Sequence, residues 1–232
     1  MVMAFEAGNE LLTILGDQTN AEFCKQTVLR LKKHIPEMNT SKQAAALLAL
    51  AKLIPPEKAN TEVLAKNGVH GMSTFYGYYM LNARAEAGDY QGALNNIREY
   101  WGGMLDLGAT TFWEDFDINW LKNAARIDQP VPEGKIDVHA TYGDYCYKGY
   151  RHSLCHGWAS GPTSWLTQYV LGIKVIEPGC KKIKLDPHLC DLEWVKGSFP
   201  TPYGVVEIEH TKTSSGEIKT TYKVPEEVQI IR

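Results

Sequence analysis

Residues 72–106 read MSTFYGYYMLNARAEAGDYQGALNNIREYWGGMLD, and they hold two helical segments separated only by Gly88 and Asp89. Glycine suits the left-handed position that ends a helix, and an aspartate after it can cap the next helix. A link this short makes the two helices antiparallel neighbours. The sequence therefore predicts a helical hairpin over residues 72–87 and 90–106.

Further helices are expected before this hairpin. The apolar spacing of residues 21–34 predicts a helix capped by Asn20, and residues 41–54, which are apolar most of the way round, predict a helix buried on several sides. Pro55-Pro56 ends that helix because proline supplies no N–H, and a short helix follows over about residues 58–66. This alternation is typical of an array of α/α hairpins, although no repeat of fixed period supports a solenoid.

The pattern changes in the second half of the chain. Residues 108–155 lose regular periodicity, and irregular segments of this length inside a compact domain are usually functional. One more helix is expected over about residues 157–171. Beyond residue 175, short segments with a period of two alternate with turn residues, which is typical of antiparallel strands. We expect a mainly α protein with a C-terminal β unit, divided into domains over residues 1–174 and 175–232.

Composition is that of a folded globular protein. Apolar residues make up 44% and charged residues 22%, and the net charge of -3 without a basic stripe argues against a nucleic-acid partner. No apolar run reaches the roughly 18 residues that span a bilayer. The amino terminus lacks the features of a signal peptide and looks like a helix entered midway. We therefore expect a piece of a longer protein, whose cellular location stays open.

The five cysteines are scattered, without a CxxC pair and without histidines at zinc spacing. We expect free thiols, although a disulfide between Cys180 and Cys190 remains open. His152 lies four residues before His156 but lacks a third ligand, so we expect no metal site. Nothing in the sequence calls for a cofactor.

Residues 108–117, GATTFWEDFD, hold three carboxylates and three aromatics within six residues. Aromatic faces bind sugar rings, and carboxylates perform acid or base chemistry on glycosidic bonds. Glu114 is the leading candidate for a general base. The alternative is a glutamate that caps a helix or forms a salt bridge, with Trp113 filling the core. Asp115 and Asp117 fit capping or supporting hydrogen bonds better.

A second candidate, His156, lies at the expected entrance of the last helix, within RHSLCHGWAS (151–160). It could donate hydrogen bonds to sugar hydroxyls or serve a structural role. Residues 70–76 could face the same cleft, although core or capping roles are favoured there. Four tyrosines could line a sugar cleft or form a packed aromatic loop: Tyr142, Tyr145, Tyr147 and Tyr150. Three aromatics at helical spacing are expected in the core: Trp158, Trp165 and Tyr169.

Three motifs, in this order, resemble the carboxyl-terminal part of the bacterial family 78 α-L-rhamnosidases. They are GATTFWEDF (108–116), HSLCHGWASGPTSWLTQYVLGI (152–173) and KKIKLDPHLCDLEWVKGSFPTPYGVVEIEH (181–210). The resemblance implies an (α/α)6 barrel followed by a small antiparallel β-sandwich. It also implies inverting hydrolysis, in which one carboxylic acid protonates the leaving oxygen and a carboxylate activates water.

By this resemblance the general base falls on Glu114, a sugar-contacting histidine on His156, and the tryptophan of the turn on Trp113, which we also expect to bind substrate. The family's general acid lies in an earlier acidic segment that has no counterpart here, and the helices suffice for half a barrel. We therefore expect part of an inverting α-L-rhamnosidase acting on rhamnose-containing glycans or glycosides, inactive alone. A half-barrel would expose apolar faces such as that of residues 41–54, which favours self-association.

Two other functions stay open. Another (α/α)-barrel carbohydrate-active enzyme would keep Glu114 and act on a different sugar. A non-catalytic carbohydrate-binding helical module would not need the carboxylate of Glu114 at all. A purely structural helical scaffold is disfavoured by the long aromatic loop.

Overall fold

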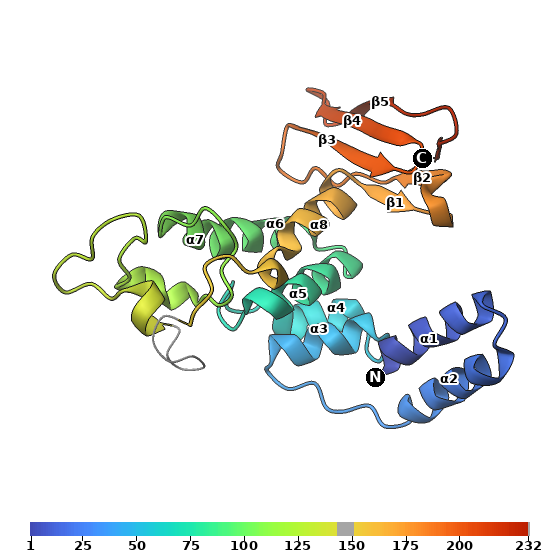
Figure 1. Ribbon diagram of the computed structural model, residues 1–232, viewed down its shortest axis with the longest axis horizontal. Coiled ribbons are helices and arrows are strands. Elements are labelled where there is room, and N and C mark those ends of the chain that lie inside the picture. Colours follow the sequence, from blue (N-terminus) through green and yellow to red (C-terminus); the bar gives the residue numbers. More distant parts are fainter. Residues whose placement is uncertain (143–150, 232) are drawn as a thin grey trace.

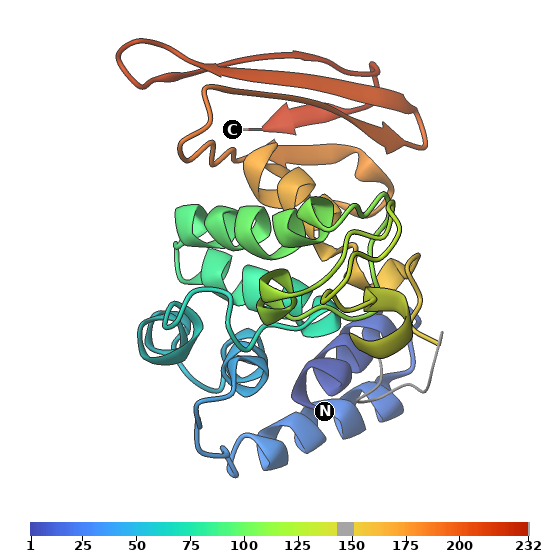
Figure 2. The ribbon, with the colours of Figure 1, turned by 90° about the vertical axis from the view of Figure 1, so that its left-hand side faces the viewer.

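The computed structural model describes residues 1–142 and 151–231, with a helical part below and a small β unit above (Figure 1). The expectation of a mainly α chain with a C-terminal β unit is confirmed. Figure 2 shows the β unit and the amino-terminal helices at opposite ends of the molecule. Tyr145, Tyr147, Tyr150 and Cys146 lie outside the described residues. None of the described helices combines the length and apolar character needed to cross a membrane.

The predicted central hairpin is present. Helix α5 (Thr74–Glu86) ends before Gly88, and the Asp89 side chain accepts the Gly92 N–H at 3.0 Å to cap α6 (Tyr90–Asn96). The second arm continues through η2 (Ile97–Trp101) into α7 (Gly102–Asp106). Helix α5 packs against α3 (Lys42–Leu50), α6 and α8 (Gly161–Trp165), so it is the central helix of the array.

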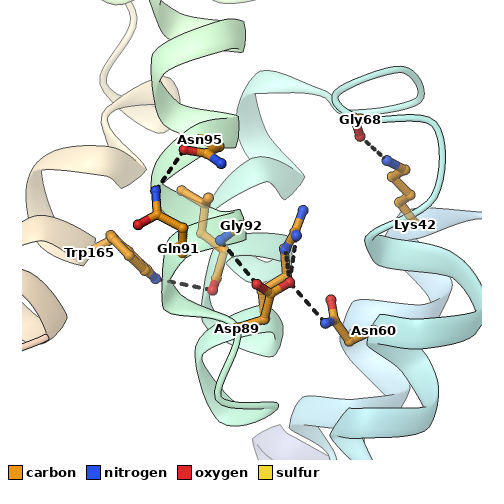
Figure 3. Close-up of polar contacts among 10 residues, drawn as sticks. Lys42, Asn60, Gly68, Asp89, Gln91, Gly92, Asn95 and Trp165 are labelled. Carbon is orange, nitrogen blue, oxygen red and sulfur yellow. Dashed lines mark hydrogen bonds and ion pairs between the residues drawn. The ribbon is translucent and has the colours of Figure 1, made fainter. Parts of the chain in front are cut away.

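Asp89 also ties neighbouring helices together (Figure 3). Its carboxylate accepts from Arg84 Nε at 3.0 Å and from Asn60 Nδ2 at 2.9 Å. Asn60 begins η1 (Asn60–Leu64), which follows α4 (Pro56–Ala59). On the other side of α5, Trp165 Nε1 donates to the Leu81 carbonyl at 3.1 Å. Polar contacts therefore fix the spacing of helices whose apolar faces already pack together.

The first two helices, α1 (Val2–Ile14) and α2 (Gln18–Leu31), form a separate hairpin at the lower right of Figure 1. Asp17, not Asn20, caps α2, because its carboxylate accepts the Asn20 N–H at 3.1 Å. The predicted cap was wrong because a stronger acceptor lies three residues earlier. A small apolar cluster joins this hairpin to the end of α3: Val2, Val28 and Ala51.

The expectation of an exposed apolar face on residues 41–54 is wrong. Helix α3 is covered by α5 and α4, so Ala45, Ala46 and Ala49 are buried. The large apolar side chains left exposed in the helical part include several on the α1–α2 hairpin: Leu11, Ile14, Leu15, Phe23 and Leu29.

The β unit contains two three-stranded sheets. One joins β1 (Ile173–Val175), β2 (Lys182–Leu185) and β6 (Gln229–Ile231), and the other joins β3 (Trp194–Thr201), β4 (Gly204–Lys212) and β5 (Ile218–Lys223). Residues from both sheets share one core: Ile183, Leu185, Val206 and Ile208. The arrangement is a small sandwich, as expected. One pairing differs, because β6 returns beside β2 in parallel after the chain has formed the other sheet.

The helical part and the β unit meet at Gly172, which follows η6 (Leu166–Val170). Its φ is +74°, and a Cβ there would lie 2.4 Å from the Pro187 amide nitrogen, so the close approach requires glycine. The preceding Leu171 packs into the β core, and its carbonyl oxygen lies 3.0 Å from His210 Nε2. The proposed domain boundary between residues 174 and 175 would fall within β1, which begins at Ile173. The division into two domains at this point stays a proposal.

Candidate active site

The turn that contains Glu114 is bound to a segment about 40 residues later in the sequence. The Glu114 N–H donates to the Ser153 carbonyl at 2.9 Å, and the His156 N–H donates to the Phe112 carbonyl at 2.7 Å. The Thr111 hydroxyl donates to the Leu154 carbonyl beside them. These bonds bring the two candidates Glu114 and His156 close together.

The Glu114 side chain is 10% exposed, and hydrogen bonds hold both the carboxylate and the backbone carbonyl of this residue. Its Oε2 accepts the Ser153 N–H at 3.0 Å and lies 3.9 Å from His156 Nδ1. Its backbone carbonyl accepts from Trp158 Nε1 at 2.7 Å and from the Thr74 hydroxyl. A carboxylate fixed in this way is preorganised, because ordering its rotamer adds no cost when a substrate binds.

An aromatic ledge lies beside the carboxylate, formed by Phe75, His156 and Trp158. The ring centroids of His156 and Trp158 are 4.2 Å apart, and those of Trp158 and Phe75 are 5.6 Å apart. Phe75 is 41% and Trp158 is 43% exposed, so both rings are accessible to a ligand. Exposed aromatic rings beside a buried carboxylate are suited to binding a sugar.

Two members of this ledge differ from the sequence expectation. Trp158 was predicted in the core, but it lies in the short 3₁₀ turn η5 (Gly157–Ala159) before α8 and is exposed. Its indole N–H donates to the Glu114 carbonyl. Phe75, for which a core or capping role was favoured, lies at the start of α5 with its ring against Trp158. Trp165 is buried, as expected, and Tyr169 is partly buried.

Trp113 fills the core behind the turn. Its ring is 0% exposed and makes edge contacts with Phe116 and His152. It therefore supports the turn from behind, and contact between this ring and a sugar stays a prediction. Of the two adjacent acids, Asp117 has the capping role that the sequence suggested. Its side chain accepts the Asn119 N–H at 2.8 Å and caps η3 (Ile118–Lys122).

His152 is a supporting residue whose importance the sequence did not reveal. It is buried, and its Nε2 lies 2.9 Å from the Asp115 carbonyl oxygen and 3.2 Å from the Asp115 amide nitrogen. It therefore holds the turn one residue beyond Glu114. In the part of the chain that the structure describes, no three histidine, cysteine or acidic side chains are placed to hold a metal ion.

Other sequence candidates are placed as follows. Tyr142 stacks on Trp120 with ring centroids 4.9 Å apart, in agreement with the packed-loop interpretation. The described cysteines are all free thiols, so Cys180 and Cys190 do not form a disulfide.

Comparison with known proteins shows what this chain is similar to. Residues 172–231 match the family described as the bacterial alpha-L-rhamnosidase C-terminal domain. An α-L-rhamnosidase from Alteromonas sp. (strain LOR) is 30% identical over 188 residues, which is 75% of this chain and 18% of that protein. The chain resembles the carboxyl-terminal portion of the family 78 α-L-rhamnosidases. It spans less than a fifth of the length of this curated relative.

Solved rhamnosidases have the same fold over almost the whole chain. The native enzyme from Aspergillus terreus has a TM-score of 0.78 at 18% identity, covering 99% of this chain and 27% of its own. The GH78 family rhamnosidase of Bacillus sp. GL1 has a TM-score of 0.75 at 20% identity, covering 99% of this chain and 25% of its own. The Streptomyces avermitilis α-L-rhamnosidase complexed with L-rhamnose has a TM-score of 0.74 at 18% identity, covering 99% of this chain and 22% of its own. At these identities the likeness establishes the fold.

Proposed function

We propose that this chain is part of an inverting glycoside hydrolase that removes terminal α-L-rhamnosyl residues from glycans or glycosides, with Glu114 as the general base. The observation that carries the proposal is the fixed Glu114 carboxylate beside His156 and the aromatic ledge. The similarity to proteins named α-L-rhamnosidase is the reason for proposing L-rhamnose as the sugar.

In this proposal Glu114 accepts a proton from a water molecule that attacks the anomeric carbon. The Ser153 N–H stabilises the negative charge of the carboxylate before the reaction, and the restricted exposure limits competition from bulk water. The proposal has His156, whose side chain is 31% exposed and lies 3.9 Å from the Glu114 carboxylate, donate a hydrogen bond to a sugar hydroxyl. Phe75 and Trp158 supply apolar faces for the sugar ring.

The general acid is proposed to come from residues outside this chain. Inverting glycosidases keep their two carboxyl groups roughly 6.5–9.5 Å apart so that a water molecule fits between them. Asp117 is engaged as a helix cap, which argues against a second role as the acid. The relative from Alteromonas sp. is long enough to supply a further catalytic segment, because this chain spans 18% of it.

Two alternatives keep part of the same geometry. Another carbohydrate-active enzyme with a barrel of helical hairpins would use Glu114 on a different sugar. A non-catalytic carbohydrate-binding module would use only the aromatic ledge. Assaying the longer protein against aryl glycosides of several sugars separates these possibilities, since only the proposed function gives selective release from the α-L-rhamnoside.

The stereochemistry of the product tests the role of Glu114. Proton NMR of the reaction of the longer protein with an aryl α-L-rhamnoside should show β-L-rhamnose first, followed by slow mutarotation to the α anomer. Initial release of α-L-rhamnose would mean retention, in which the second carboxylate acts as a nucleophile and not as a base for water. That result would overturn the proposed mechanism.

A further inference from the structure

The backbone carbonyl of Glu114 accepts two hydrogen bonds from side chains of two different elements. The Thr74 hydroxyl donates to it from the start of α5, and Trp158 Nε1 donates to it from η5 at 2.7 Å. On the other side of the same peptide bond, the Asp115 amide nitrogen lies 3.2 Å from His152 Nε2. A carbonyl oxygen has two lone pairs, so the two donors satisfy it and fix the plane of this peptide.

The two elements that hold this carbonyl also carry the aromatic ledge. On α5 the residue after Thr74 is Phe75, and its ring centroid lies 5.6 Å from that of Trp158. In η5, Trp158 supplies both the second donor and a ring of the ledge. Each element therefore contributes one donor to the Glu114 carbonyl and at least one ring to the ledge. A shift of either element would displace the ledge and the Glu114 backbone together.

The short turn η5 has its own support. Trp101 Nε1 in η2 donates to the Ala159 carbonyl at 2.9 Å, and Ala159 is fully buried. The indole of Trp158 has a single polar hydrogen, and Glu114 receives it. Because the Trp158 ring is exposed while its N–H is engaged, a ligand can contact the ring without displacing this hydrogen bond.

We propose that Thr74 and Trp158 are positioning residues for Glu114, and that Trp158 joins the sugar-binding ledge to the general base. The inference rests on the proposed function, because it takes Glu114 as the base and the ledge as the place of the sugar. A misplacement of roughly 1 Å can lower the rate of a reaction about 10²-fold. Loss of one donor should therefore lower kcat more than it raises KM.

Conservative substitutions separate the hydrogen bonds from the packing. Trp158→Phe keeps a ring in the ledge and removes the indole N–H, whereas Thr74→Val keeps the shape of the side chain and removes the hydroxyl. Thr74→Ser keeps a donor at the same position. Phe75→Leu removes a ring of the ledge and leaves both donors in place. Trp165→Phe is the matched control, because it removes an indole N–H that donates to the Leu81 carbonyl in the core at 3.1 Å.

The first measurement is hydrolysis of an aryl α-L-rhamnoside by the longer protein. We expect kcat to fall about tenfold in Trp158→Phe and in Thr74→Val, with KM within about twofold of the wild type, since each variant loses one neutral hydrogen bond. Thr74→Ser should recover most of the wild-type kcat, and Phe75→Leu should act mainly through KM. Trp165→Phe should lose stability and keep the wild-type kcat. A wild-type kcat in both Trp158→Phe and Thr74→Val would overturn the proposal.

The second measurement, amide hydrogen exchange in the 232-residue chain, does not depend on activity. The N–H groups of Glu114 and His156 join the turn to the segment before α8, so their exchange reports whether the turn stays in place. In the double variant Thr74→Val and Trp158→Phe, both should exchange faster, while the Ala93 amide in α6 exchanges as in the wild type. Unchanged exchange at both amides would overturn the proposal.

The two measurements distinguish this proposal from the proposed function. If the longer protein hydrolyses no aryl rhamnoside while the exchange pattern holds, the proposed function fails and the positioning of Glu114 by the two donors stands. If Glu114→Gln abolishes hydrolysis while Trp158→Phe and Thr74→Val keep the wild-type kcat, the positioning fails and the proposed function stands.

Discussion

Glu114 is held by three groups from two separate parts of the chain, the start of α5 and the segment before α8. Thr74 at the start of α5 and Trp158 in η5 both donate to its carbonyl, and the Ser153 N–H donates to its carboxylate. The position of the carboxylate therefore depends on the packing of α5 against the segment before α8. Substitutions at Ser153 that keep the backbone N–H should be tolerated better than changes that move this segment.

Lys42 provides a test at the residue scale, because it is 6% exposed and its ammonium donates to the Gly68 carbonyl. Burial, aided by the nearby Arg84 charge, lowers the pKa of Lys42 from 10.5 to about 8. Between these values the unfolded chain holds a proton that the folded chain has lost. The contribution of Lys42 to the free energy of unfolding should therefore increase from about pH 8 to pH 10.5.

The measurement is urea unfolding at several pH values for the wild type and Lys42→Met. The wild type should gain stability relative to the variant across that interval, because methionine has no proton to lose. Subtracting the two curves removes the tyrosine and cysteine titrations that both proteins share. Parallel curves would show that the pKa of Lys42 is not lowered by folding.

At this scale the sequence singled out the candidate residues but not the groups that hold them in place. The residue types around positions 108–117 were enough to single out Glu114, and a histidine at a helix entrance singled out His156. His152 and the Ser153 N–H could not be recognised, since their roles depend on two irregular segments meeting in space. Trp158, which was expected in the core, is 43% exposed, because periodicity does not predict exposure in irregular segments.

At the scale of elements, Asp89 combines a helix cap with an ion pair to a nearly buried arginine. The side chains of Arg84 and Asp89 are 7% and 27% exposed. Hydrogen bonding to Asn60 and Arg84 outweighs burial and lowers the pKa of Asp89. Asp89→Ala should lower the free energy of unfolding by about 2–4 kcal/mol, because it removes the cap and leaves the Arg84 charge without this partner.

Asp191→Ala is the matched control for this substitution. Asp191 pairs with Arg98 in a bidentate arrangement, but both side chains are about half exposed, so the loss should be no more than about 1 kcal/mol. Denaturant unfolding of both variants compares the two sites. Equal losses would contradict the assignment of Asp89 as the polar link between η1, α5 and α6.

The elements themselves were largely predictable. Turn chemistry at Gly88 and Asp89 placed the central hairpin, and the change of period near residue 175 placed the β unit. The parallel pairing of β6 with β2 could not be predicted, because it depends on a long-range return of the chain. The start of α2 was also predicted wrongly, for a local reason. Two acceptors three residues apart, Asp17 and Asn20, compete for the cap.

At the scale of the whole molecule, apolar composition alone did not predict which helices are covered by their neighbours. Helices α1 and α3 are both strongly apolar, yet α3 is buried, whereas α1 and α2 keep large apolar residues exposed. Which face is covered depends on the neighbouring helices. A half-barrel was a reasonable expectation from the resemblance, and the fold agrees with that of the matching part of the solved rhamnosidases.

The proposed division of the site gives a prediction about the 232-residue chain on its own. Without the general acid, a contribution worth about 10²–10⁴ in rate is missing, so the purified chain should hydrolyse an aryl α-L-rhamnoside at a negligible rate. Release of the aryl group, followed by absorbance, is the measurement. Turnover by the purified chain that disappears in Glu114→Ala would show that the site is complete without further residues.

The most direct test of the central claim is the rate of aryl α-L-rhamnoside hydrolysis by the longer protein carrying Glu114→Gln, with Glu133→Gln in an exposed loop as the matched control. Our account predicts a fall in kcat of at least about 10² for Glu114→Gln with L-rhamnose binding largely kept, and a wild-type rate for Glu133→Gln. A wild-type rate in Glu114→Gln would contradict it.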